Sequence, residues 1–133
     1  FEPNDGLLFT GDAAGIYVPG RAVVKETSPP PQFDLEACLD DVRAIEALNP
    51  DTLCFGHFGS VAYRSELMAK YKRTLVEWVE AVRQKRADLG DDAVREHFAN
   101  ATDLAGVWSG RKARAEERLN AGGVLTALDR GNA

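Results

Sequence analysis

Short apolar runs and amphipathic helical stripes alternate in the first part of the chain, and only helical stripes follow. The turn signal Asn4-Asp5-Gly6 precedes a run of β-compatible residues at 7–10, which predicts a short strand. A second apolar run at 52–55 predicts another strand. Between them, the Gly- and Pro-rich stretch 13–32 predicts a loop with one brief extended piece at 22–24. A loop of this length is typical of a segment that lines a site.

Apolar residues at 3–4 spacing predict the helices. The first begins at Asp34, a residue suited to an N-cap, and ends at Asn49-Pro50. The helices that follow are expected at 61–89, 92–99 and 109–120, with a last amphipathic turn or two after Gly122-Gly123.

The two predicted strands are apolar at consecutive positions, which is typical of strands buried on both faces. Two or three strands of this length are too few to form a sheet between two covering layers. We therefore expect the chain to be the back part of a larger fold. Its start at Phe1, without an initiator methionine, agrees with this expectation.

The composition of the chain excludes some classes of protein and disfavours others. The 133 residues carry a net charge of −5 with 44 % hydrophobic residues, which excludes wholesale disorder and disfavours nucleic acid as a partner. No apolar run is long enough to span a membrane, and no signal peptide is visible. Cys38 and Cys54 lack motif spacing, so we expect two buried, reduced thiols and a cytoplasmic location.

Each predicted strand ends in a glycine followed by a side chain that can bind metal: Gly11-Asp12 and Gly56-His57. A carboxylate with an imidazole suits zinc, iron or manganese, although two ligands do not complete a site. Taken alone, Asp12 is more typical of a turn than of a metal ligand, and His57 is more typical of a hydrogen-bonded histidine at a strand end. His97 is interpreted as a surface residue.

Taken together, these segments resemble the metallo-β-lactamase superfamily. Residues 7–15 (LLFTGDAAG) look like its fourth metal motif, and residues 56–59 (GHFG) look like its fifth. The connection through residues 29–34 and the helix ending at 47–51 also resemble the segment that joins these two motifs in the family. The resemblance implies an α+β fold, namely the C-terminal part of a four-layer αββα sandwich (residues 1–60), followed by a helical C-terminal region (residues 61–133).

The resemblance also implies a function. Asp12 would bridge two metal ions, zinc by first choice with iron or manganese as alternatives, and could steer the nucleophile's proton as a catalytic residue. His57 would complete the second metal's ligands. The reaction would be attack of metal-bound hydroxide on an ester, thioester, lactone or similar bond of a small-molecule substrate.

One departure from the family limits this reading. The signature His-x-His-x-Asp-His and a further histidine are absent, since the chain has only His57 and His97. At least four ligands must therefore come from elsewhere, and we expect this chain alone to be inactive.

The apolar stripe of the helical tail is interpreted mainly as core. The tail is also compatible with a cap over the active-site mouth, for which Tyr17, Phe58, Tyr63 and Trp108 are candidate lining residues. Pairing of two copies as a homodimer would cover exposed strand faces. The alternative function is a non-catalytic helical module for protein interaction.

Overall fold

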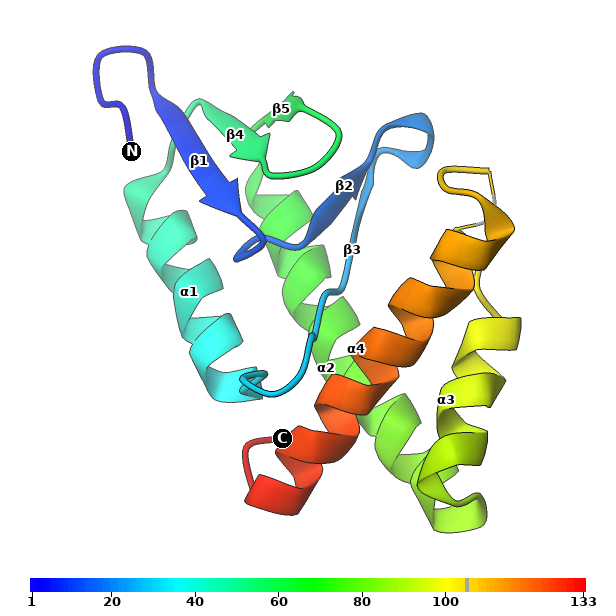
Figure 1. Cartoon of the computed structure of the whole chain (residues 1–133). Coiled ribbons are helices and arrows are strands. Elements are labelled where there is room, and N and C mark those ends of the chain that lie inside the picture. The colour runs from blue at the N-terminus through cyan, green and yellow to red at the C-terminus, as the bar shows by residue number, and fades with distance from the viewer. Residues whose placement is uncertain (105) are drawn as a thin grey trace. The chain divides into compact units, whose positions relative to one another are not determined.

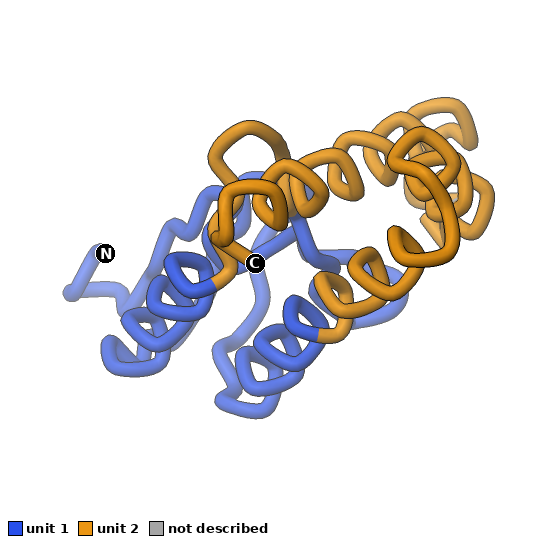
Figure 2. The backbone as a smooth tube through the Cα atoms, turned by 90° about the horizontal axis from the view of Figure 1, so that it is seen from below, with its two compact units in different colours: residues 1–27, 36–76 blue, residues 28–35, 77–133 orange. Residues whose placement is uncertain are grey.

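A computed structural model describes residues 1–104 and 106–133. The chain forms two compact units, one made of residues 1–27 and 36–76 and the other of residues 28–35 and 77–133 (Figure 2). The long helix α2 (Ser65–Asp88) contributes residues to both. The domain boundary expected at residue 60 stays a prediction. Within the described residues, no helix combines the length and apolar character needed to cross a membrane.

The first unit contains a three-stranded sheet. Its strands β1 (Leu7–Gly11), β4 (Thr52–Phe55) and β5 (Ser60–Ala62) lie in the order β1-β4-β5 (Figure 1). The pairing is parallel between β1 and β4 and antiparallel between β4 and β5. Both strands predicted from apolar runs are confirmed.

Strand β5 replaces the predicted start of the long helix. Residues 60–62 were expected at the edge of a helix over 61–89, but α2 begins only at Ser65. Val61 pairs with Leu53 of β4, so this segment forms one strand of a tight β4–β5 hairpin. A strand of three residues carries almost no local signal, and its partner decides its conformation.

A second hairpin lies within the segment predicted to be loop. Strand β2 (Ile16–Val18) and strand β3 (Val23–Lys25) pair antiparallel, joined by the short 3₁₀ turn η1 (Pro19–Arg21). The extended piece expected at 22–24 is the second of these strands, and the prediction missed the first. Val18 and Val24 are buried, so burial in the core supports this short pairing.

One face of the three-stranded sheet is buried and the other is open. Leu8, Leu53 and Phe55 are buried, whereas Phe9 is 68 % exposed. Phe9 pairs with Cys54, which is half-buried, as is Cys38 on helix α1 (Leu35–Leu48). The expectation of strands buried on both faces, and of two buried thiols, is therefore wrong for the described residues.

The second unit is helical. It contains the C-terminal half of α2, helix α3 (Asp91–Asn100) and helix α4 (Gly110–Arg130), with α3 packed against α4. Helix α4 runs without a break through Gly122-Gly123, where the sequence suggested an interruption. A Cβ at residue 123 would lie 1.7 Å from the carbonyl oxygen of Ser28. Glycine at this position therefore allows another backbone segment to touch the helix.

A buried polar cluster fixes that contact. The Ser28 amide donates to Oδ1 of Asn120 at 2.9 Å, and its hydroxyl donates to the Asn120 carbonyl at 2.9 Å. The indole Nε1 of Trp78 donates to the same hydroxyl at 2.9 Å, and its ring meets Phe98 edge-on. These bonds satisfy buried polar groups that would otherwise destabilise the unit by about 1–3 kcal/mol each.

The close approach of residues 28 and 123 gives a stability prediction. Alanine normally stabilises a helix interior relative to glycine, but Gly123→Ala would drive a methyl group into the Ser28 backbone. We expect a loss of about 3 kcal/mol in the free energy of unfolding, measured with urea. Gly110→Ala is the matched control, since its Cβ would meet only an Arg114 nitrogen at 3.7 Å. Equal stability of the two variants would contradict the prediction.

Tyr71 on α2 gives a pH prediction. Burial raises the pKa of its phenol far above the usual value, with Cys38 and Glu26 adding to the rise. The unfolded chain ionises this phenol above pH ~10 while the folded chain does not. Stability is therefore complete below pH ~10 and falls above it, by at most about 1.4 kcal/mol per pH unit. In urea titrations between pH 9 and 11, Tyr71→Phe should show a shallower decline than wild type; parallel curves would refute it.

Candidate metal site

The parallel pairing of β1 and β4 brings Asp12 and His57 together. The backbone amide of Gly56 donates to the carbonyl of Gly11 at 3.2 Å, which extends the ladder to the ends of both strands. Asp12 directly follows β1, and His57 follows Gly56 just beyond the end of β4. Their side chains meet with His57 Nε2 3.7 Å from Asp12 Oδ1, although 45 positions separate them in sequence.

A β-bulge sets the alignment of the two strand ends. Phe9 pairs with Cys54, but Gly11 pairs with Phe55, so Thr10 is the extra residue on β1. The Thr10 hydroxyl lies within hydrogen-bonding distance of the Gly11 carbonyl at 3.2 Å and the Cys54 carbonyl at 3.4 Å. Thr10 thus ties the bulge to β4. Thr10 is not among the predicted site residues, because a bulge of this kind depends on the pairing with β4.

A tight turn holds the Asp12 backbone. The amide of Ala13 donates to the Thr10 carbonyl at 3.1 Å, and the amide of Gly15 donates to the Asp12 carbonyl at 2.9 Å. Gly15 has a φ of +79°, and a Cβ there would lie 2.5 Å from the Lys25 carbonyl oxygen. Only glycine closes this turn without strain.

The loop that carries His57 is equally short. Residues 56–59 connect β4 to β5, and the amide of Phe55 donates to the Gly59 carbonyl at 2.9 Å. Phe58 has a φ of +66° and a side chain that is 41 % exposed. A non-glycine residue in the left-handed region indicates a loop held in place by its surroundings.

The two side chains have a geometry that suits one metal ion. Two ligands of a tetrahedral ion lie ~3.4 Å apart when each metal–ligand distance is about 2.1 Å. The observed 3.7 Å separation needs little adjustment, and both side chains are about half exposed, at 58 % for Asp12 and 51 % for His57. In the described part of the chain, no group of three His, Cys, Asp or Glu residues is placed to hold a metal. The donor set fits a metal but is incomplete.

The other sequence candidates lie in different places. The Tyr17 ring stacks on Phe55 at 5.5 Å, two residues before His57, and lines a cavity of about 240 Å³ with Arg64 and Lys70. Tyr63 is half-buried, and burial with the nearby Glu46 raises its pKa.

The second unit contains His97 and the candidate lining residue Trp108. His97 is exposed and contacts Phe98, as expected of a surface residue. Trp108 has the ammonium of Lys112 4.9 Å from its ring centroid.

Comparison with known protein families gives a second line of evidence for this site. Residues 1–57 match the metallo-beta-lactamase superfamily. The resemblance seen in the sequence is confirmed over this segment, which contains both strand-end motifs and ends at His57. The match supports a metal-dependent hydrolase in general terms, and the helical remainder lies outside it. No curated protein matches the chain.

The turn after Asp12 supplies a prediction. Gly15→Ala would combine an unfavourable positive φ with contact to the Lys25 carbonyl, so we expect a loss of about 2–3 kcal/mol in the free energy of unfolding. Gly20→Ala is the control, because no atom lies within 4 Å of its Cβ position. Chemical denaturation of both variants tests this, and a Gly15→Ala variant as stable as Gly20→Ala would show that the turn is unstrained.

Proposed function

We propose that this chain is the C-terminal part of a metal-dependent hydrolase of the metallo-β-lactamase type, with Asp12 and His57 as metal ligands. The 3.7 Å approach of these two side chains at the ends of two parallel strands carries the proposal. The family match over residues 1–57 supports it.

In this proposal the chain contributes two of the ligands and the backbone that fixes them. The Asp12 carboxylate would ligate the metal and steer the nucleophile's proton, and the His57 imidazole would ligate the metal. Bound zinc, or iron or manganese in its place, supplies polarisation of the substrate bond and a water whose pKa falls toward ~7. The Thr10 bond to β4 and the turn closed at Gly15 hold the Asp12 backbone and limit its movement.

The open sheet face fits a larger fold. Phe9 is 68 % exposed beside half-buried Cys54, and a covering layer on this face would bury both. We propose that a second sheet, as in a four-layer αββα sandwich, covers this face in the intact protein and brings the remaining ligands. When the 133-residue chain is isolated, pairing of two copies would cover the same face. The substrate in this proposal is a small molecule with an ester, thioester, lactone or similar bond.

Metal content and hydrolysis of the full-length gene product test the function. We expect a bound transition metal by mass spectrometry and activity on at least one of a thioester, a lactone and a phosphodiester. Asp12→Ala and His57→Ala should lose metal and reduce activity by roughly 100-fold or more, because polarisation of the substrate and activation of water both depend on the metal. His97→Ala, an exposed histidine of the second unit, is the matched control.

Two outcomes separate the proposal from its rival. Full metal content and activity in both ligand variants would refute the assignment of Asp12 and His57. A full-length protein that holds no metal, hydrolyses nothing and binds a macromolecule through its helices would favour the interaction module instead.

A further inference from the structure

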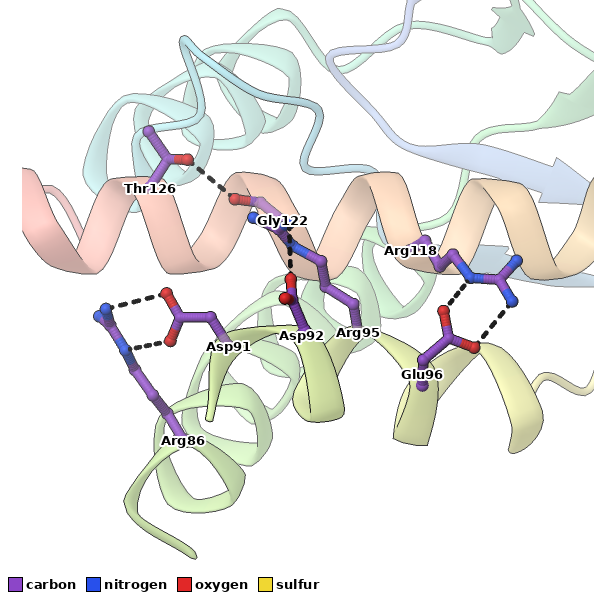
Figure 3. A network of polar contacts seen from close by, with 8 residues as sticks. All are labelled: Arg86, Asp91, Asp92, Arg95, Glu96, Arg118, Gly122 and Thr126. Atoms are coloured by element: carbon purple, nitrogen blue, oxygen red, sulfur yellow. Dashed lines mark hydrogen bonds and ion pairs between the residues drawn. The ribbon is translucent and has the colours of Figure 1, made fainter. Parts of the chain in front are cut away.

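Three arginines lie along the contact between helices α3 and α4, and two of them are fully paired (Figure 3). Arg86 donates to both carboxylate oxygens of Asp91, at 2.9 and 3.2 Å, and forms an ion pair with Asp129 at 2.8 Å. Arg118 forms a two-point pair with Glu96, with one bond of 2.8 Å. Such two-point pairs are the strongest arrangement that arginine makes with a carboxylate.

Arg95, between these two, is different. Its only ion pair among the described residues is to Asp92 at 3.6 Å, and the Asp92 side chain is fully exposed to solvent. A contact of that length with an exposed carboxylate contributes little. The Nε of Arg95 is buried, and within residues 1–104 and 106–133 it has no hydrogen-bond partner. Arg95 is therefore a half-buried cation whose charge the protein leaves largely unmatched.

Gly122 on α4 makes room for this guanidinium. A Cβ at residue 122 would lie 3.3 Å from Nε of Arg95, and Figure 3 shows the Arg95 side chain reaching from α3 to the Gly122 backbone. The Gly122 carbonyl is already bonded by the Thr126 hydroxyl at 2.9 Å. Glycine inside a helix costs about 1 kcal/mol relative to alanine, and at residue 122 it leaves room for the Arg95 guanidinium.

The unmatched guanidinium borders a cavity of about 440 Å³. Apolar and small residues make up most of the wall, and Arg118, whose charge Glu96 already neutralises, is the other cation. The volume lies within the range of small-molecule sites, which combine mostly apolar walls with a few placed polar groups. Residues lining this cavity are Pro30, Arg95, Ala115, Arg118, Leu119, Gly122 and Thr126.

We propose that this cavity binds a small organic anion, with a carboxylate or phosphate group on Arg95 and an apolar chain or ring against Leu119 and Pro30. The guanidinium fork matches the oxygens of either acid group, and the anion supplies the charge that Asp92 does not. The site belongs wholly to the second unit and is independent of the metal ligands.

Titration of the chain with octanoate tests the site, and calorimetry and amide chemical shifts in NMR spectra report the binding. We expect octanoate to bind at least about tenfold more tightly than 1-octanol, because its carboxylate adds one charge-assisted hydrogen-bonded pair. Arg95→Gln should reduce octanoate binding to the level of octanol. Arg83→Gln, on an exposed α2 arginine paired with Glu80, should leave it unchanged. Octyl phosphate and inorganic phosphate distinguish the acid group from the apolar part, and inorganic phosphate should bind at least about tenfold more weakly than octyl phosphate.

A second variant covers the case in which Arg95→Gln fails to fold. Leu119 is 46 % exposed, so Leu119→Asp adds a negative charge to the cavity wall without disturbing the core. It should weaken octanoate binding by tenfold or more, whereas Leu48→Asp, equally exposed on α1, should not. Equal binding of octanoate and octanol, or of octanoate to wild type and Arg95→Gln, would overturn the proposal, as would inorganic phosphate binding as tightly as octyl phosphate.

Discussion

The parallel pairing of β1 with β4 is the constraint on which the rest of the first unit depends. Parallel neighbours cannot be joined by a tight turn, so the chain must return through a long crossover, here the β2–β3 hairpin and α1. The same pairing places the two carboxyl ends at one edge of the sheet. Asp12 and His57 meet there because each follows a glycine of the last hydrogen-bonded pair. Their meeting is thus a consequence of strand direction.

In the second unit, the packing depends on the close approach of Ser28 to α4. Gly123 removes the side chain that would block the Ser28 carbonyl, and Asn120 and Trp78 then bond the serine from the helices on either side. This contact anchors residues 28–35 to helices that lie far along the chain. A helix interior with two consecutive glycines is weak by propensity, and tertiary contacts with Ser28 and Arg95 account for both of them.

Each unit has a group whose usual partner is not supplied by the described residues of that unit. The first unit presents two metal-competent side chains, half exposed, beside a sheet face on which Phe9 lies open. The second unit holds Arg95, whose ion pair with exposed Asp92 is long at 3.6 Å, whereas Arg86 and Arg118 each form a two-point pair with a carboxylate. A buried polar atom without a hydrogen bond and an exposed apolar sheet face are the places where ligands or partners are expected.

The sequence alone determined the strands at 7–10 and 52–55, the helices, and the two motifs that carry Asp12 and His57. These features rest on local patterns: consecutive apolar residues, 3–4 spacing, and glycine before a polar side chain. Strands β2 and β5, the continuous α4 and the open face of the sheet were decided by the tertiary structure. Three-residue strands have little local preference, and a glycine pair disfavours a helix locally, so the conformation of each depends on the segment that packs against it. The 3.7 Å approach of Asp12 to His57 is of the same kind, because the parallel pairing of β1 with β4 and the bulge at Thr10 set it.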